Sequence, residues 1–503
     1  MKRVLPTIVI SQFFCTSLWF AGNAVMGDIA KEFQLDASYL ANLASAVQLG
    51  FIAGTLVFAV LGVSDKFSPS KVFFWCAVIA SVINLGVSWA GNTGASLLVM
   101  RALTGFCLAG IYPVGMKIAS DHYQQGLGKS LGFLVGALVL GTAFPHFLKN
   151  FLAGMPWRYV IFSTSALSLT GGAAMLVLVP DGVGRQPGRR IKLSDFLNGF
   201  HHPKFRAAAF GYFGHMWELY AFWVFVPVMI TAYNLHYPSA VLNVPLWSFL
   251  IIAIGSLSCV ASGYVSQKFG AKRVATIALS VSCICCLISP LLMLNGSVIL
   301  FLSFLFIWST FVIADSPLFS TLIAQNAPAE TKGTSLTIVN CIGFAITIVS
   351  LQLVSLLRTD SNVGYVYLIL AVGPVLGLIS LNLNLLNLTI IRISKPKLLF
   401  SVRLVDNEMG FKEIIVVDNC DFEDFYYFAK KLERSLKISY TDKINDFDSL
   451  YWEFGFMDSK LILHYNTFLG ICIYPEKTKD ASQSDNNILF EVYRLIKRNK
   501  AFH

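Results

Sequence analysis

Long apolar runs alternate with short polar segments over the first four hundred residues of the chain. A helix that spans a bilayer needs about 20 predominantly apolar residues, and runs of this length recur throughout the region. Each run predicts one membrane-spanning α-helix. The predicted spans number twelve, near residues 5–28, 38–63, 71–90, 96–119, 129–151, 158–179, 206–232, 244–266, 274–294, 297–323, 334–357 and 364–391.

A polar segment divides these runs into two sets of six. The segment, from about residue 180 to residue 204, is rich in glycine and carries a cluster of arginines. Such a composition is typical of a loop between structural units. We therefore expect an N-terminal six-helix half at 1–180, a basic connecting loop at 181–204 and a C-terminal six-helix half at 205–395.

The composition indicates what covers these helices. Hydrophobic residues make up 55% of the 503 residues and charged residues only 13%, with a mean hydropathy of +0.65. A soluble domain carries about a quarter of its residues as charges, because its surface must be wetted. Lipid must therefore cover this chain, and the composition predicts a multi-pass membrane protein within a bilayer.

The distribution of lysine and arginine predicts the orientation, because these residues concentrate in cytoplasmic loops. If the N-terminus is cytoplasmic, the opposite side holds only Lys31, Lys149, Arg158 and Arg358. We therefore expect both termini in the cytoplasm and the body in a bacterial-type inner membrane. The same bias accounts for much of the net charge of +10, so we expect no nucleic-acid partner.

The pattern changes at about residue 400. Before it, 24 Lys and Arg stand against 11 Asp and Glu, and from there on 14 stand against 17. Strands are predicted near 413–417, 450–456 and 461–474, and helices near 422–436, with Asp421 as its N-cap, and 488–498. These elements predict a small cytoplasmic α+β domain at 400–503. It is either a regulatory module for an unknown cytoplasmic partner or a structural appendage.

The ten cysteines lie mostly inside apolar runs, where a thiol usually acts as a small hydrophobic group. Cys283, Cys285 and Cys286 form the densest group, but no histidine or carboxylate lies near them in the same run. Zinc sites ordinarily combine such ligands at short spacings. We therefore predict no metal site, no cofactor and no disulfide framework.

The two halves repeat weakly. The segment DKFS at 65–68 corresponds to QKFG at 267–270 after 202 residues, YP at 112–113 to SP at 316–317 after 204, and GKSL at 128–131 to GTSL at 333–336 after 205. Nearly equal separations in equivalent helices and loops indicate a duplicated six-helix unit. Many secondary transporters are built from such repeats.

These features resemble the major facilitator superfamily over about residues 1–395. The family's loop motif G-x-x-x-D-[RK]-x-G-[RK]-[RK] is matched at 263–273, with Gln267 in the acidic position. A less complete copy at 62–71 keeps Asp65 and Lys66. The family's fourth-helix pattern R-x-x-x-G is present as Arg101 and Gly105.

The resemblance implies a fold of two pseudo-symmetric six-helix halves that transport a small solute by alternating access. We expect the protein to be monomeric in the membrane. The antiporter glycine motif of the fifth helix is only partial, at Gly132, Gly136, Gly141 and Pro145, so uptake and efflux both stay open. The family also implies that loop charges latch the halves in one conformation. The candidate gating residues are Asp65, Lys66, Lys71, Gln267, Lys268 and Arg273.

Ionisable side chains inside a span are expensive and mark candidate functional sites. Glu218 lies about a dozen residues into the seventh span, near mid-membrane, and His215 shares its helical face. The two predict a proton-binding pair, with a structural hydrogen-bonded pair as the alternative. Asp315 precedes Pro317 and either couples protons or satisfies the helix break. Arg101, which the resemblance links to proton transfer, could equally snorkel or bind a backbone carbonyl.

Polar and aromatic residues predict a solute-binding cavity. The first span carries a stripe at helical spacing, and the resemblance places spans one, four, seven and ten around the cavity. Aromatic residues near helix ends are alternatively interfacial anchors. The candidate cavity residues are Gln12, Thr16, Trp19, Asn23, Tyr112, Trp217, Tyr220, Trp308 and Asn340.

Three functional classes remain. The leading hypothesis is a secondary transporter of a small organic solute, coupled to protons through Glu218 as a symporter or antiporter. The second is a membrane-anchored sensor or scaffold, in which the body binds a solute and the C-terminal domain signals. A membrane-embedded enzyme is disfavoured because the chain lacks a clustered catalytic set. No phosphate-binding loop is present in the sequence, so we do not expect ATP to drive transport.

Overall fold

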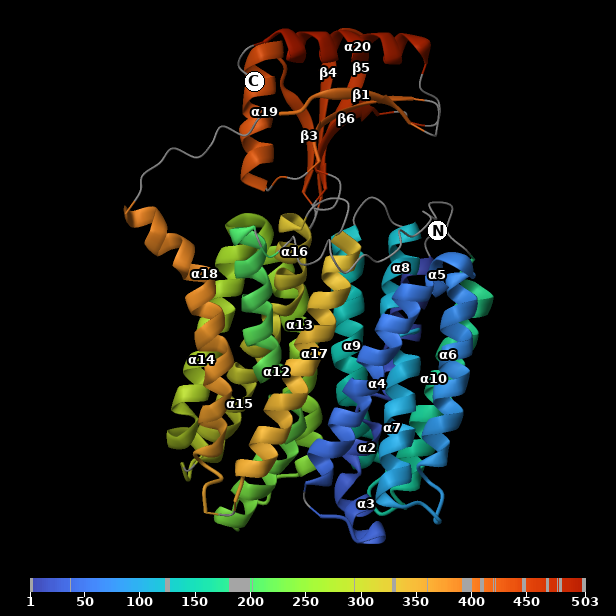
Figure 1. Ribbon diagram of the computed structural model, residues 1–503, viewed down its shortest axis with the longest axis vertical. Helices are drawn as coiled ribbons and strands as arrows, with labels where there is room; N and C mark the ends of the chain where they lie inside the picture. Colours follow the sequence, from blue (N-terminus) through green and yellow to red (C-terminus); the bar gives the residue numbers. More distant parts are fainter. Residues whose placement is uncertain are drawn as a thin grey trace.

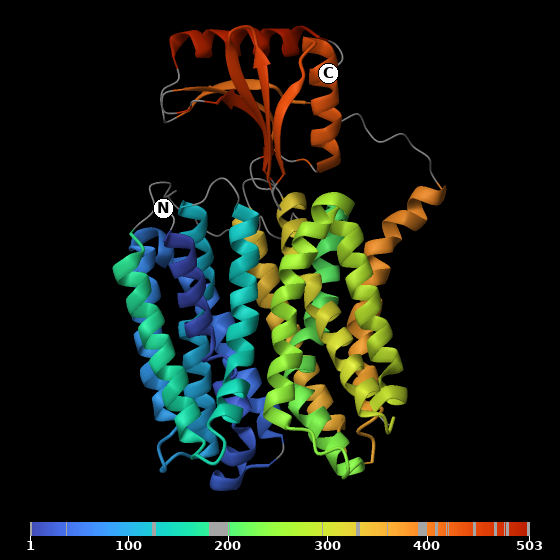
Figure 2. The same ribbon diagram turned by 180° about the vertical axis from the view of Figure 1, so that it is seen from behind.

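Two helical halves stand side by side, and a small α+β domain lies against one end of them (Figures 1 and 2). The computed structural model describes residues 3–36, 38–122, 127–180, 200, 202–293, 295–327, 332–359, 361–390, 400–407, 411–418, 420, 422–445, 449–466, 470–476, 478 and 482–499. We call the end of the bundle that faces the C-terminal domain the domain side, and the opposite end the far side. The N-terminus lies on the domain side (Figure 1).

Among its described residues, the N-terminal half contains ten helical segments. They are α1 (Val4–Thr16), α2 (Ala21–Ala24), α3 (Met26–Phe33), α4 (Tyr39–Leu61), α5 (Val63–Lys66), α6 (Pro69–Gly86), α7 (Gly94–Leu108), α8 (Tyr112–His122), α9 (Leu127–Phe151) and α10 (Arg158–Leu178). The C-terminal half contains α12 (Pro203–His236), α13 (Val244–Phe269), α14 (Ala271–Met293), α15 (Val298–Ala314), α16 (Ser316–Asn326), α17 (Lys332–Leu357), η2 (Val366–Ala371) and α18 (Val372–Ile390).

The described residues contain ten helices long and apolar enough to cross a membrane, if α7–α8 and α15–α16 each count as one. The first and last predicted spans are interrupted, because each consists of more than one helical segment. The first is divided into α1, α2 and α3, and the last into η2 and α18. Pro374, near the start of α18, lacks the amide hydrogen that a continuous helix requires there.

Two further spans break at matching places in the two halves. α7 gives way to α8 before Pro113, and α15 gives way to α16 at Asp315, before Pro317. A proline lacks the amide hydrogen that would continue the preceding helix, but it is tolerated in the first turn of a new helix, where both prolines lie. The repeated YP and SP dipeptides therefore produce equivalent interruptions.

Glycine allows α4 and α7 to touch along their backbones. A Cβ atom at Gly105 would lie 1.9 Å from the carbonyl oxygen of Val47, and one at Gly50 would lie 1.7 Å from that of Ala102. Real atoms do not approach so closely, so a side chain at either position would push the helices apart. This contact explains the glycine of the R-x-x-x-G pattern physically.

Hydrogen bonds join the two halves on the far side. Gln352 of α17 donates to Asn42 and Ser45 of α4, over 3.1 and 2.9 Å. Nearby, Asn243 donates to Asn150 over 2.8 Å. The far ends of the halves are therefore held together by uncharged side chains.

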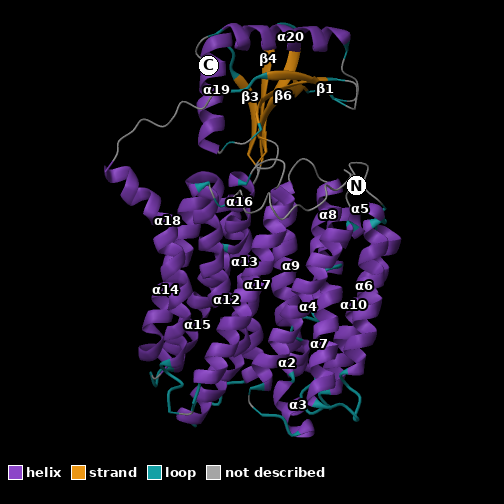
Figure 3. Cartoon of the chain, viewed as in Figure 1, coloured by secondary structure: helices purple, strands orange, loops and turns teal. Residues whose placement is uncertain are grey.

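The C-terminal domain is a six-stranded antiparallel sheet with two helices (Figure 3). The strand order is β1-β2-β6-β5-β4-β3. The elements are β1 (Arg403–Asp406), β2 (Lys412–Val417), α19 (Phe422–Leu436), β3 (Tyr440–Asn445), β4 (Ser449–Phe456), β5 (Ser459–Asn466), β6 (Gly470–Pro475) and α20 (Gln483–Arg498). Both helices pack on one sheet face, where Phe425 and Val492 share a core with Ile414 and Leu463.

The sequence predictions for this domain omit the two edge strands, β1 and β3. Both are short and charged, with sequences RLVD and YTDKIN. An edge strand pairs on one side only, and charge there discourages pairing with other chains. The same charged residues interrupt the pattern of apolar residues by which a strand is recognised in a sequence. The predicted cap Asp421 lies outside the described residues.

Candidate functional site

The Glu218 carboxylate is enclosed by the C-terminal half. It comes from the middle of α12, and the whole residue has no exposed surface. Trp308 of α15 donates its indole N–H to it over 2.5 Å, Ser282 of α14 donates over 2.9 Å, and the thiol of Cys286 over 3.2 Å. A buried charge is tolerated only when such donors satisfy it. We call this group of four residues the Glu218 cluster.

His215 and Asp315 form a second buried pair. The His215 Nδ1 atom lies 2.8 Å from an Asp315 carboxylate oxygen, and both side chains are at most 1% exposed. Both are also among the described side chains without a well-directed hydrogen bond, so the contact is a close ion-pair approach with poor alignment. Asp315 occupies the break between α15 and α16, so this pair ties α12 to the point where the tenth span is interrupted.

The predicted pairing of His215 with Glu218 is not what the geometry favours. The two residues are three positions apart on α12, yet each faces a different partner from another helix. Helical spacing placed them on one face but carried no information about α14 or α15. Asp315 occupies the N-cap position of α16, but its side chain forms no capping hydrogen bond there, so the alternative that it satisfies the helix break gains no support from its contacts.

Arg101 holds the interrupted first span together. Its guanidinium donates to the carbonyl oxygens of Leu18 over 3.0 Å and Trp19 over 2.5 Å, and to the side-chain oxygen of Asn84 over 3.3 Å. Residues 17–20, between α1 and α2, lack a continuous helix, so some of their carbonyls need donors from elsewhere. Three roles are predicted for Arg101: proton transfer, snorkelling or binding of a backbone carbonyl. Its contacts match the last of these.

Asn84 extends the Arg101 site across the N-terminal half. Its amide donates to Ile161, Thr164 and Ser165 of α10, with the shortest bond of 2.9 Å to Ser165. Arg101 thus connects α7, the break after α1, α6 and α10 through one buried network. We call Arg101, Asn84 and the two carbonyls of residues 18 and 19 the Arg101 cluster.

A cluster of aromatic rings joins the two halves between these charged sites. Trp19 stacks on Tyr220 at 5.9 Å and on Phe344 at 5.8 Å between ring centroids. Phe51 contacts Trp19 at 4.9 Å and Phe344 at 4.8 Å. Trp19 and Phe51 belong to one half, and Tyr220 and Phe344 to the other. We call these four residues the ring cluster; Trp223 extends it by a contact with Tyr220.

Several amides near the first and second spans are buried without a hydrogen bond among the described residues. Both amide atoms of Gln12, Asn23 and Gln48 are of this kind, as are the indole nitrogens of Trp19 and Trp223. Gln48 and Phe51 lie one helical turn apart on α4. These groups are candidates to bind a polar solute.

The other predicted cavity residues are distributed more widely. Thr16 donates to the carbonyl of Gln12 inside the N-terminal half, and Trp217 donates to Ile369 of η2. Asn340 accepts from Tyr212 over 2.6 Å, while Trp308 belongs to the Glu218 cluster. Tyr112 is half-buried at the start of α8.

The predicted gating residues lie at the ends of helices that flank two loops on the domain side. Gly62, with φ of +60°, ends α4 before α5, and Gly270, with φ of +83°, separates α13 from α14. The Lys66 and Lys71 side chains are exposed, as is Arg273. The side chain of Asp65 lies outside the described residues.

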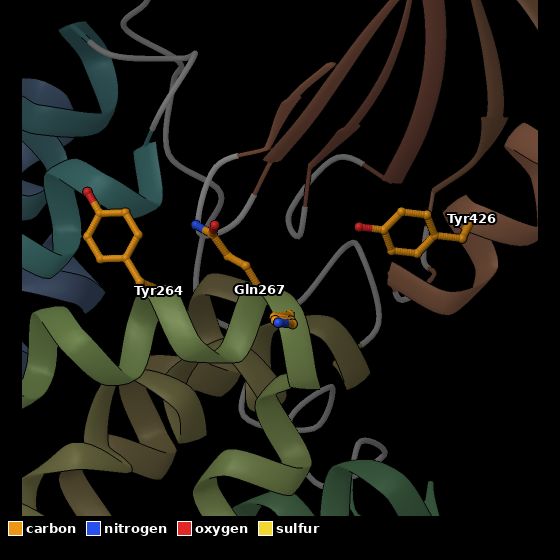
Figure 4. A pocket seen from close by; sticks show the side chains of 4 residues that line it. Tyr264, Gln267 and Tyr426 are labelled. Atoms are coloured by element: carbon orange, nitrogen blue, oxygen red, sulfur yellow. The ribbon is translucent and has the colours of Figure 1, made fainter. Parts of the chain in front are cut away.

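An open pocket of roughly 390 Å³ lies between the second of these loops and the C-terminal domain. Tyr264, Gln267 and Lys268 line it from α13, and Tyr426 of α19 faces it from the domain (Figure 4). Nearby, Gln325 of α16 donates to the hydroxyl of Tyr465 over 3.2 Å. The C-terminal domain therefore contacts the C-terminal half in particular.

The partners in these clusters were partly missed by sequence reasoning. Ser282, Cys286, Asn84, Gln48, Phe51 and Phe344 all lie in apolar helices and carry no motif. A polar residue inside a span is a weak signal by itself, because it also forms ordinary bonds to its own helix. No group of three or more His, Cys, Asp or Glu suited to a metal occurs among the described residues; Cys286 instead donates to Glu218.

Comparison with known protein families supports the fold described above. The sequence profile of the Major Facilitator Superfamily matches residues 8–351, which is well over half of the chain. The chain therefore belongs to the Major Facilitator Superfamily, and it carries an additional α+β domain at its C-terminus.

Relatives match this chain only over parts of their length. An efflux pump of Gibberella moniliformis is 27% identical over 179 residues, which is 35% of this chain and 30% of the pump. An uncharacterised transporter of Escherichia coli, YgaY, is 27% identical over 170 residues, covering 32% of this chain and 42% of that protein. The chain thus spans less than half of these relatives' length.

Solved structures share the fold at low identity. The nucleoside transporter NupG has a TM-score of 0.60 at 14% identity, covering 75% of this chain and 98% of that protein. A bacterial homologue of the lysosomal transporter Spinster, in an inward-facing and unoccupied conformation, has a TM-score of 0.55 at 13% identity. That match covers 76% of this chain and 95% of the homologue.

Proposed function

We propose that this protein is a proton-coupled secondary transporter that moves a small organic solute by alternating access. Membership of a transporter family supports transport, and the Glu218 cluster supports proton coupling. The single observation that carries the proposal is a carboxylate with no exposed surface whose donors all come from neighbouring helices. An ionisable group in this position is a functional hypothesis by default.

The proposed coupling depends on the donors of Glu218. Trp308 lies on α15 and Ser282 and Cys286 on α14, so any relative movement of α12 changes their distances to the carboxylate. A carboxylate that loses donors in a low-dielectric site is stabilised by binding a proton. A carboxylate that regains them is stabilised in its charged form. Proton binding and release would thus follow the helix movements of the transport cycle.

His215 and Asp315 would transmit these movements. Their contact joins α12 to the break between α15 and α16. A bend at such a break changes the separation of the pair without unfolding either helix. Proline-interrupted helices at a binding site are a common feature of transporters.

The orientation belongs to the same proposal. We propose that the domain side faces the cytoplasm of a bacterial-type inner membrane, since basic loops gather there. In that orientation the C-terminal domain is cytoplasmic and available to an unknown partner. We propose a monomer, because each half already finds its partner within the chain through the ring cluster.

Reconstitution tests this function directly. The purified full chain would be placed in liposomes that contain a pH-sensitive dye, and organic acids, metabolites and antibiotics would be added in turn. A proton flux that one solute class drives and that Glu218→Gln abolishes is the expected result. The direction of the proton flux relative to the solute separates symport from antiport.

Matched variants sharpen this assay. Glu218→Gln keeps the size of the side chain and an acceptor for Trp308, so the fold is expected to persist. Ser280→Ala on α14 is a control, because that hydroxyl bonds its own helix at Thr276 rather than Glu218. Proton flux that survives in Glu218→Gln would refute the proposed coupling site, and solute binding without any flux would favour a sensor.

A further inference from the structure

We infer that the transported solute is an uncharged, planar aromatic compound with hydrogen-bonding groups at its edge. The inference rests on the proposed function, because it names the class of solute that would bind between the halves. It is carried by three observations: where the charged side chains of the spans point, what joins the halves, and which buried polar groups lack partners.

The charged side chains near mid-membrane are engaged within their own halves. Arg101 binds Leu18, Trp19 and Asn84, all in the N-terminal half. Glu218 accepts only from residues of α14 and α15 among its described partners, and Asp315 faces His215. His146, another buried histidine of the spans, shares no described ring contact or hydrogen bond with the ring cluster.

The surface shared by the halves is instead aromatic. In the ring cluster, Trp19 stands at 23° to Tyr220 and at 30° to Phe344, so each pair is stacked rather than perpendicular. These stacks exist only while the halves are together at this level. When they separate in a transport cycle, the flat faces of Trp19, Tyr220 and Phe344 lose their partners. A flat aromatic solute replaces those partners most completely.

The polar groups beside the rings are neutral and can both donate and accept. Gln48 is fully buried and Asn23 is 7% exposed, and neither amide has a partner among the described residues. The Trp19 indole N–H also lacks a partner among the described residues, and it can only donate a hydrogen bond. Amides and indoles complement a solute that has both acceptors and donors at its edge, such as a carboxamide or a heterocyclic lactam.

Charge on the solute is disfavoured by the same arrangement. A buried ion needs an opposite charge or several directed donors. The ring cluster supplies neither: its side chains are uncharged, and the described hydrogen bonds of Arg101 and Glu218 run to residues of their own halves. A cationic solute could still contact the ring faces, which makes charge the variable that an experiment must isolate.

Four small probes separate the effect of the solute's charge from the effect of its aromatic ring. They are 4-fluorobenzamide, 4-fluorobenzoate, 4-fluorobenzamidine and cyclohexanecarboxamide: a neutral aromatic, its anion and cation counterparts, and a neutral compound without an aromatic ring. Fluorine NMR of the purified full chain in detergent measures binding of the first three, and displacement of 4-fluorobenzamide measures the fourth. We expect 4-fluorobenzamide to bind at least about tenfold more tightly than each of the others.

Two variants connect that binding to the ring cluster. Trp19→Leu removes the central ring, and Gln48→Met keeps the side-chain length but removes the amide. Each is expected to weaken 4-fluorobenzamide binding by about tenfold. Trp75→Leu is the matched control, because Trp75 is 59% exposed on the outer surface of α6; it should leave binding unchanged.

Contrary outcomes are equally clear. Tighter binding of the benzoate or the benzamidine would overturn the assignment of an uncharged solute. Equal binding of cyclohexanecarboxamide would overturn the aromatic requirement. No binding of any probe, or binding that survives Trp19→Leu, would show that the ring cluster is not a solute surface. Binding without proton flux would refute the proposed coupling while leaving this inference intact.

Discussion

Each half of the membrane body has a buried ionic side chain where equivalent helices cross. The two side chains carry opposite charges and are bound by different kinds of partner. Asn84 of the Arg101 cluster and Cys286 of the Glu218 cluster are separated by 202 residues, the same separation that relates the repeated loops. In the N-terminal half the ion is a cation, bound mainly by backbone carbonyls. In the C-terminal half it is a carboxylate, bound by side chains of two other helices.

This difference assigns different tasks to the two halves. A guanidinium stays protonated under all ordinary conditions, and backbone carbonyls cannot move without the main chain. The Arg101 cluster is therefore suited to hold a broken helix in place. A carboxylate can be neutralised by one proton, and side-chain donors can rotate away. The Glu218 cluster is therefore suited to change state, although both clusters lie where equivalent helices of the two halves meet.

The largest expected effect is a loss of stability, which should be much greater for a change at Arg101 than for one at Glu218. Arg101→Met leaves the carbonyls of residues 18 and 19 without their donor, so we expect a loss of about 3–5 kcal/mol in the free energy of unfolding. Glu218→Gln, which keeps an acceptor at the same place, should cost less than about 1 kcal/mol. Denaturant unfolding in one detergent measures both. Equal losses in the two variants would break the comparison.

The C-terminal domain lies outside the membrane body and contains a buried titratable side chain, His464. This histidine can be compared with the ionic clusters of the membrane body. Burial lowers the pKa of His464 to about 3, where its ring lies 3.6 Å from the Cys472 thiol and stacks on Tyr451, with Tyr474 at its edge. In the unfolded chain the pKa is about 6.5. The unfolded state therefore binds the extra proton between these values, and stability falls as the pH falls below about 6.5.

At pH 5 this difference amounts to about 2 kcal/mol relative to pH 8. His464→Phe keeps a ring against Tyr451 and should remove that part of the acid sensitivity. Unfolding of the domain in the full chain, followed at pH 5 and pH 8, measures the effect. A variant as acid-sensitive as the original would show that burial of His464 is not its cause.

A smaller effect should come from the contact between α4 and α7. Gly105→Ala introduces a Cβ atom 1.9 Å from the carbonyl oxygen of Val47, so we expect a loss of about 1–3 kcal/mol from overpacking. Gly132→Ala is the control, since nothing lies within 4 Å of the added atom. Thermal unfolding of both variants tests whether the N-terminal half is as rigid as the comparison requires.

The smallest expected effect concerns the contact between the halves. Gln352→Ala removes the bonds to Asn42 and Ser45 on the far side, at a cost of about 1 kcal/mol. The halves should then separate more often on that side. Ala41→Cys, placed on α4 where the residue is 1% exposed, reports this as faster labelling by a membrane-impermeant maleimide. Unchanged labelling would show that other contacts hold the halves together.

Local sequence information determined the membrane architecture of this protein. A bilayer demands about 20 apolar residues per span, so most spans and the duplicated halves could be predicted from short segments, as could the break at Asp315 before Pro317. The tail helix at 422–436 was recognised with the same bounds as α19. The costly ionisable residues Arg101, His215, Glu218 and Asp315 were recognised for the same reason, because they stand out in apolar surroundings.

Only the tertiary structure decided what each of these groups does. Helical spacing made His215 and Glu218 neighbours, but packing turned one toward Asp315 and the other toward Trp308. Trp308, a predicted cavity residue, donates to the carboxylate, while Phe51 and Phe344 carried no signal and belong to the ring cluster. Hydropathy acts on each segment separately. A hydrogen bond or a stacked ring depends on two segments far apart in the chain, and those meet only when the helices pack.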